Sequence, residues 1–117
     1  MNKFSMITPL MGEYFTTVRL AVGGLCALAG FDVDSMEDFK VCVTESLLIL
    51  KRNGFTSASI SLTLGEELAC EIAGEGLCGE KEDTPENEIS LVLLSALLGS
   101  VDFVNDGDKV VKIQFKG

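Results

Sequence analysis

The sequence predicts an α+β fold, a two-layer sandwich in which three helices cover one face of an antiparallel or mixed β-sheet. The spacing of apolar residues along the chain predicts elements in the order strand, helix, helix, strand, strand, helix, strand, strand. Apolar residues make up 47% of the chain, enough to build a packed core. The chain has 117 residues and shows no internal repeat or linker, so we expect residues 1–117 to form one domain.

The N-terminal quarter of the chain predicts one strand followed by one helix. Residues 3–7 alternate apolar and polar side chains, which is typical of a strand. The helix is predicted to begin with Thr8 as its N-cap and Pro9 as its first residue, and Gly30 is predicted to end it. The Gly23–Gly24 pair either weakens this helix or lets another segment pack closely against it.

Residues 32–54 predict the second helix, because their apolar residues recur at helical spacing. Asp34 or Ser35 is expected to cap its N-terminus. Lys51 and Arg52 stand near its end, where positive charge complements the helix dipole.

The second half of the chain predicts two hairpins separated by a helix. Residues 55–76 predict two strands joined by a turn at 64–67, residues 88–100 predict an apolar helix, and residues 101–117 predict the closing hairpin. Residues 78–88 predict an acidic loop. We interpret this loop either as a solvated segment or as a docking surface for a basic protein partner.

The net charge of −9 limits the classes of partner. Sequence-independent nucleic-acid binding depends on Lys and Arg neutralising phosphates, so neither nucleic acid nor an anionic membrane surface is expected. No apolar stretch is long enough to span a bilayer, and the N-terminus lacks a signal-peptide pattern. We therefore expect a cytoplasmic protein. Its acidity is compatible with a basic protein partner.

The cysteines are interpreted as buried free thiols. They form no C-x-x-C pair, the chain contains no histidine, and a zinc site would need ligands from widely separated segments. No metal site is therefore expected from Cys26, Cys42, Cys70 and Cys78.

The order of elements, with a carboxylate in the second helix, resembles the GHKL (Bergerat) ATP-binding fold. The most similar members are the bacterial anti-sigma factor serine kinases and related histidine-kinase-like ATPase domains. Residues 14–46 resemble the first two helices of this family, and residues 91–106 resemble its last helix and the strand after it. The resemblance implies ATP and Mg²⁺ as cofactors and dimerisation through the first helix. The partners that it implies are a sigma factor and an anti-sigma factor antagonist.

The catalytic position of the family falls on Glu45. In the family, the second helix carries a Glu as general base and, four residues later, an Asn that helps to hold magnesium; this spacing puts both on one helix face. Glu45 matches the first position, but the second is Ile49, which offers no oxygen to the metal. Glu45 is thus the candidate catalytic residue, vestigial if the protein is inactive. Ile49, like Leu47 and Leu50, is interpreted as core.

The candidate nucleotide-binding residues are Gly74 and Gly76. They match the glycines of the family's Asp-x-Gly-x-Gly motif, which let the backbone approach the nucleotide, and they would do so here only if ATP is bound. Ile72 stands at the adenine-reading Asp position, and Glu71, one residue away, points to the opposite face of a strand unless a bulge intervenes. Without a nucleotide, both glycines are interpreted as serving a turn that needs positive φ.

The family's third motif, a glycine-rich turn that cradles phosphates, is also changed. Glu88 and Ser90 stand where its glycines belong, and the preceding segment is rich in carboxylates. A triphosphate there would meet like charges, each close pair costing about 1 kcal/mol in water and about 4 kcal/mol at an effective dielectric constant of about 20.

Three hypotheses follow. The first is a degenerate anti-sigma factor-like regulator that binds proteins and needs no cofactor. The second is an active ATP-dependent serine/threonine protein kinase that uses Glu45 as base and Glu71 in place of the adenine-reading Asp. The third is an unrelated α+β interaction module; different helix placement, or a first strand that is not paired with the terminal hairpin, would favour it.

Overall fold

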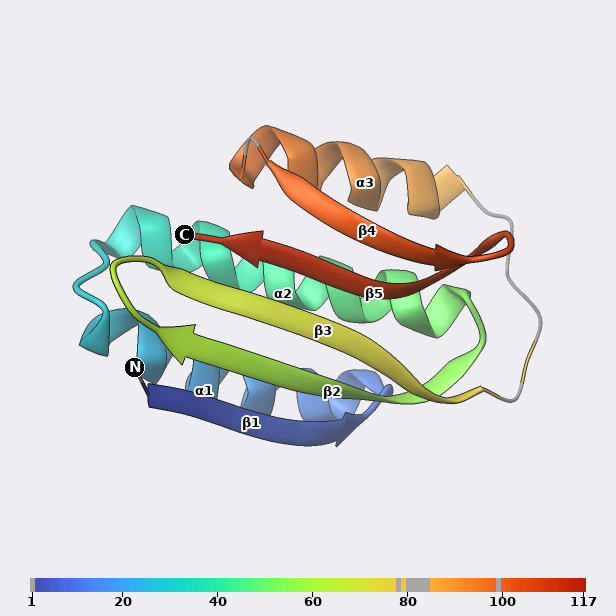
Figure 1. Ribbon diagram of the computed structural model, residues 1–117, viewed down its shortest axis with the longest axis horizontal. Coiled ribbons are helices and arrows are strands. Elements are labelled where there is room, and N and C mark those ends of the chain that lie inside the picture. The colour runs from blue at the N-terminus through green and yellow to red at the C-terminus, as the bar shows by residue number, and fades with distance from the viewer. Residues whose placement is uncertain (1, 78, 80–84, 99) are drawn as a thin grey trace.

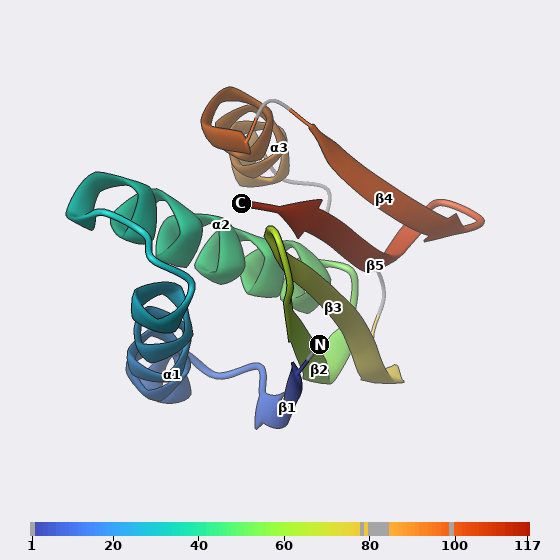
Figure 2. The same cartoon turned by 60° about the vertical axis from the view of Figure 1, so that its left-hand side comes forward.

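The computed structural model describes residues 2–77, 79, 85–98 and 100–117 and confirms the predicted α+β two-layer sandwich (Figure 1). Five strands form one sheet, and the three helices lie on the same side of it (Figure 2). The strands are β1 (Asn2–Pro9), β2 (Phe55–Leu64), β3 (Leu68–Leu77), β4 (Val101–Asp106) and β5 (Lys109–Lys116). The helices are α1 (Phe15–Leu28), α2 (Val33–Arg52) and α3 (Pro85–Leu98), with a short 3₁₀ turn, η1 (Gly12–Tyr14), before α1.

All neighbouring strands of the sheet are antiparallel, in the order β1-β2-β3-β5-β4. Both predicted hairpins are confirmed, and Gly107, with φ at +64°, lies in the turn of the second. Strand β1 pairs with β2 at the edge opposite to β4. The first strand is therefore not paired with the terminal hairpin, which is the arrangement that we expected of an unrelated module. The helices, by contrast, lie on one face as predicted.

The hydrophobic core lies between α2 and the central strands. Alternate residues of β2 and β3 point toward the helices and are fully buried, as the antiparallel alternation requires. From α2, Leu47, Ile49 and Leu50 enter this core with at most 2% of their surface exposed, and Leu48 packs against it. Burying each such side chain stabilises the fold by about 1.5–3 kcal/mol. The interpretation of Ile49 as a core residue is confirmed.

The predicted start of the first helix at Thr8 and Pro9 is wrong. Both residues belong to β1, and the Leu10 backbone N–H continues the pairing by donating to the Thr56 carbonyl oxygen at 2.9 Å. Proline lacks a backbone donor but is tolerated on an edge strand, and β1 is an edge. Helix α1 starts only at Phe15 and ends before Gly30, whose φ of +83° confirms the predicted stop.

The second helix is capped by Asp32 and not by Asp34 or Ser35. The Asp32 carboxylate accepts a hydrogen bond from the Ser35 backbone N–H at 2.7 Å, which satisfies one of the free donors of the first turn. This hydrogen bond lowers the pKa of Asp32. Lys51 and Arg52 occupy the last turn, as predicted.

The interpretation of the cysteines is confirmed for Cys26, Cys42 and Cys70, which are free and buried. Burial raises the pKa of Cys26 to about 11 and that of Cys42 to about 12, so neither thiol ionises readily near neutral pH. Cys78 lies outside the described residues. Within the described ranges, none of the helices is both long and apolar enough to cross a bilayer.

Candidate functional site

The candidate catalytic residue Glu45 lies where α2 packs against α3. The hydroxyl of Ser90, on α3, donates a hydrogen bond to Oε2 of Glu45 at 2.6 Å. The same hydroxyl accepts a hydrogen bond from Nη1 of Arg52 at 2.9 Å. Ser90 therefore lies between a carboxylate and a guanidinium. We call Glu45, Ser90 and Arg52 the α2–α3 polar contact.

Helical geometry explains how these three residues meet. Glu45 and Arg52 are seven residues apart on α2, which puts both on the same face after two turns. Ser90 is only 1% exposed, so its hydroxyl needs partners for both its proton and its lone pairs. Hydrogen bonds to charged groups of this kind contribute about 1.5–3 kcal/mol each when they are well shielded from water.

Sequence reasoning missed this contact. The prediction treated Ser90 only as a lost glycine and Arg52 only as a partner of the helix dipole. The signal that could have found it is the polar residue at position 90, which interrupts the apolar run of α3 on its buried side.

At the family's magnesium position α2 carries no side-chain oxygen, and the amide oxygen one turn later is already hydrogen-bonded. Ile49 is 2% exposed and belongs to the core. One turn further, Asn53 is 1% exposed, and both polar atoms of its amide are hydrogen-bonded. Its Nδ2 donates to the Ile49 carbonyl oxygen at 2.7 Å, and its Oδ1 accepts from the Val110 backbone N–H at 2.9 Å. Asn53 thus connects the end of α2 to β5 and is not available to a metal.

The position of the adenine-reading Asp is also occupied by a core residue. Ile72 is fully buried and is in register with Ile60 on one side and Ile113 on the other. Glu71 lies on the opposite face of the sheet and forms an ion pair with Lys112 at 2.9 Å. Hydrogen bonding to Lys112 lowers the pKa of Glu71. Because the pairing of β3 is regular here, Glu71 does not reach the helix-covered face, where the kinase alternative needs it.

Gly74 and Gly76 lie within β3 and not in a turn. Gly74 is in register with the buried Ala58, and a Cβ on Gly74 would meet the Phe55 ring at 2.5 Å. The aromatic ring therefore occupies the space next to the Cα of Gly74. Gly76 has φ at +64°, which confirms the positive-φ interpretation for this glycine alone. Its carbonyl oxygen accepts a hydrogen bond from Thr56 Oγ1 at 2.8 Å.

The third motif is described only in part. Of the acidic loop predicted at 78–88, residues 78 and 80–84 lie outside the described residues. Gly79 lies beside Gly54, and its carbonyl oxygen accepts a hydrogen bond from Lys109 Nζ at 2.8 Å. Residues from 85 onward belong to α3, which therefore begins three residues before the predicted start.

Two surface cavities lie away from the α2–α3 polar contact. One, of about 650 Å³, lies over the polar face of the sheet, with Ser61, Glu71 and Gln114 among its walls. The other, of about 420 Å³, lies where the start of α2 approaches the end of α3. The described part of the chain contains no group of three or more Cys, Asp or Glu residues arranged to hold a metal ion.

Comparison with known proteins gives distant similarity to protein kinases. No family model matches the chain. The serine-protein kinase RsbW of Bacillus mycoides is 23% identical over 126 aligned positions, which cover 90% of this chain and 79% of the kinase. RsbW of Bacillus cereus is 22% identical with the same coverage. The similarity runs through nearly the whole domain and agrees with the resemblance to serine kinases that the sequence suggested.

Proposed function

We propose that this chain is an anti-sigma factor-like regulatory protein of bacterial transcription that acts by binding another protein, without binding ATP and without kinase activity. Its similarity to RsbW over 90% of its length supports the regulatory class. The observation that carries the loss of catalysis is the hydrogen bond from Ser90 to Glu45. The residue in the position of the general base is held by the protein itself.

The chemistry of a kinase requires a base that faces a substrate proton and a metal on the phosphates. Here the proton that Glu45 faces belongs to buried Ser90, at 2.6 Å. Ile49 supplies no oxygen for Mg²⁺, and the Phe55 ring lies over Gly74. These three features support the proposal that the chain does not bind ATP.

The test is isothermal titration calorimetry of the chain with ATP and MgCl₂, with RsbW of Bacillus mycoides measured in parallel. We expect no binding heat from this chain, whereas a micromolar dissociation constant would contradict the proposal. Two-dimensional NMR with the same titration adds a second readout, because the Gly74 and Gly76 amides would shift if a nucleotide were bound.

The alternative function is an active ATP-dependent serine/threonine protein kinase. It is favoured by the retained Glu45 and by the kinase names of the relatives. Labelled ATP and a candidate anti-sigma factor antagonist would be incubated with the chain, with Glu45→Ala and with Glu13→Ala as an exposed control. A phosphoprotein that Glu45→Ala abolishes and Glu13→Ala leaves intact would establish the kinase.

We further propose that two copies of the chain associate through α1. Leu20 and Leu28 are 72% and 76% exposed, and between them Gly24 has no heavy atom within 4 Å of where its Cβ would be. Residues at this spacing share one helix face, so α1 presents an apolar stripe that a second copy could cover. Light scattering after size exclusion should give a dimer mass for the native chain and a monomer mass for Leu20→Glu. Arg19→Glu, at an exposed position about 100° around α1 from Leu20 and away from this stripe, is the control.

A further inference from the structure

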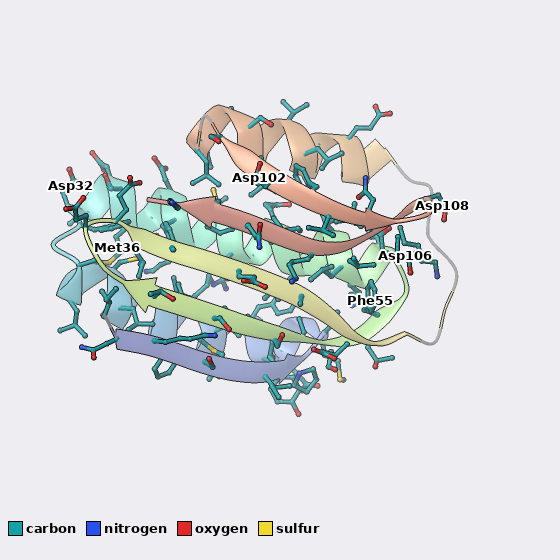
Figure 3. The ribbon with its side chains drawn as sticks, in the orientation of Figure 1. Asp32, Met36, Phe55, Asp102, Asp106 and Asp108 are labelled. Carbon is teal, nitrogen blue, oxygen red and sulfur yellow. The ribbon has the colours of Figure 1, made fainter. Side chains whose placement is uncertain are left out.

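A groove at one end of the molecule combines apolar walls with carboxylates. It has a volume of about 420 Å³, in the range of cavities that hold small ligands or anchoring side chains. It lies where the chain turns into α2, at the end of the molecule opposite to Asp106 and Asp108 (Figure 3). We call this cavity the α2–α3 groove; its walls include Phe31, Asp32, Asp38, Phe39, Leu97 and Leu98.

The apolar part of the groove is held by a row of aromatic rings. Phe31 meets Phe39 edge to face, with ring centroids 5.5 Å apart, and Phe39 meets Phe115 at 5.2 Å. Phe39 is only 2% exposed, so it forms a fixed base, while Phe31 and Leu97 remain partly exposed. Edge-to-face aromatic pairs add about 0.5–1.5 kcal/mol of stability beyond that of their buried area. A guest side chain would therefore meet a preformed apolar surface.

The charged part of the groove favours a cation. Its walls carry the carboxylates of Asp32 and Asp38 against one ammonium, that of Lys116. Asp32 is held by its hydrogen bond from Ser35, which favours the ionised carboxylate. The whole chain has a net charge of −9, so the electrostatic potential around the molecule is negative, like the potential of the groove itself. An anionic ligand would be repelled by both.

An exposed apolar residue follows the groove residues at the start of α2. Val33, next in the chain to Asp32, is 72% exposed. A small molecule confined to the groove would leave it in water, whereas a protein segment could cover it as well. Apolar anchors surrounded by complementary charge are the usual composition of a protein interface.

We propose that the α2–α3 groove is a docking site for a protein segment in which apolar side chains alternate with Lys or Arg. An apolar side chain packs against Phe31 and Leu97, and the flanking cation reaches Asp38. This inference rests on the proposed function, because it identifies the chemistry of the partner that the regulator binds.

The probes are three fluorescein-labelled peptides of matched length. One contains Leu and Arg in an amphipathic pattern, the second has each Arg replaced by Glu, and the third has each Leu replaced by Ser. Anisotropy is measured with the full chain at about 0.15 M ionic strength, where the Debye length is about 8 Å and distant charges are screened. We expect only the Leu–Arg peptide to bind.

Two variants locate the binding. Asp38→Lys reverses a groove charge and should weaken binding of the Leu–Arg peptide about tenfold, while Asp106→Lys makes the same change of net charge at the far end and should change it less than about twofold. Asp38→Glu keeps the charge and should retain binding. Circular dichroism and a thermal melt show whether each variant is folded. If Asp38→Lys does not fold, Asp38→Asn removes the charge without changing the size of the side chain, and unchanged binding by that variant would overturn the proposal.

The groove proposal is overturned if the three peptides bind equally or if Asp38→Lys and Asp106→Lys weaken binding equally. Absence of binding by the Leu–Arg peptide overturns it too, as do amide shifts in ¹H–¹⁵N spectra that map to the polar face of the sheet instead of Gly30, Phe31 and Leu97. ATP calorimetry on the same sample separates the two proposals. If ATP gives no binding heat and the peptide does not bind, only the groove proposal is rejected. If ATP binds and the peptide still docks, only the proposal that the chain does not bind ATP is rejected.

Discussion

The two halves of helix α2 differ in what their polar side chains contact. In the C-terminal half, Glu45, Arg52 and Asn53 are hydrogen-bonded to α3, to β5 or to their own helix. In the N-terminal half, Asp32 caps the helix and Asp38 is exposed at the wall of a groove. The half that resembles a nucleotide site is occupied by intramolecular contacts, and the half without a family motif offers an open surface. The comparison shows that the polar side chains of one half hold α2 to the rest of the domain, whereas those of the other half border an open groove.

In the C-terminal half of α2, the largest expected effect on stability comes from Asn53→Ala. The variant removes the acceptor of the partly buried Val110 N–H as well as the side-chain cap of α2. An unsatisfied buried donor costs about 1–3 kcal/mol, so with the lost cap we expect the free energy of unfolding to fall by about 2–3 kcal/mol. Urea denaturation measures the change. Asn105→Ala, at an exposed position on β4, is the control, and an equally small loss in both variants would show that Asn53 does not hold α2 to β5.

The next effect comes from Gly74→Ala, which tests whether Phe55 closes the space over β3. The added methyl group would meet the Phe55 ring at 2.5 Å and displace it. Overpacking of this kind costs about 1–3 kcal/mol. Gly24→Ala is the matched control, because its Cβ meets nothing within 4 Å and alanine is favoured in a helix by about 1 kcal/mol. The unfolding free energies should move in opposite directions, and a neutral Gly74→Ala would contradict the packing of Phe55.

Ser90→Ala should have a smaller effect, about 1 kcal/mol. The variant removes the hydroxyl between Glu45 and Arg52, but both of these residues are partly exposed and can be solvated in its absence. The measurement is again urea denaturation, with exposed Ser95→Ala on the same helix as control. If Ser90→Ala gained measurable ATP affinity, Ser90 itself would be what closes the family's site.

Much of the fold could be predicted from local patterns. The alternation of β2 and β3, the helical spacing in α2 and the turn at Gly107 each depend on neighbours in the sequence, and all were predicted. The start of α1 could not be predicted, because Thr8 and Pro9 are typical of a helix start. The pairing of β1 with β2, which continues through Leu10 and Thr56, decides their conformation. The pairing partner is more than forty residues away in the sequence, so no local pattern reveals it.

The residue types at the candidate site could be read from the sequence, but the contacts that these residues make could not. Ile49 and Ile72 have no polar atom in their side chains, so the sequence alone shows that Ile49 cannot ligate a metal and that Ile72 cannot hydrogen-bond to the adenine amino group. The role of Ser90 depends on the way α3 packs on α2, which brings residues 45 positions apart within 2.6 Å. The position of Phe55 over Gly74 likewise follows from strand register, which sequence periodicity does not determine.

The smallest predicted effect concerns the N-terminal end of α2 and the pH dependence of the stability that its cap provides. The hydrogen bonds from the backbone N–H and then the side chain of Ser35 hold the pKa of Asp32 below its ordinary value of 3.8. A carboxyl with a lowered pKa in the folded state adds stability that is fully present above its unfolded pKa and is lost as the pH falls through its folded pKa. Asp32→Asn keeps a capping side chain without the titrating group, so its urea midpoint should fall less steeply than that of the native chain below pH 3.8. Asp34→Asn makes the same change of charge in the first turn of α2 and is the control. If the urea midpoint falls equally less steeply at low pH in both variants, the cap is not responsible.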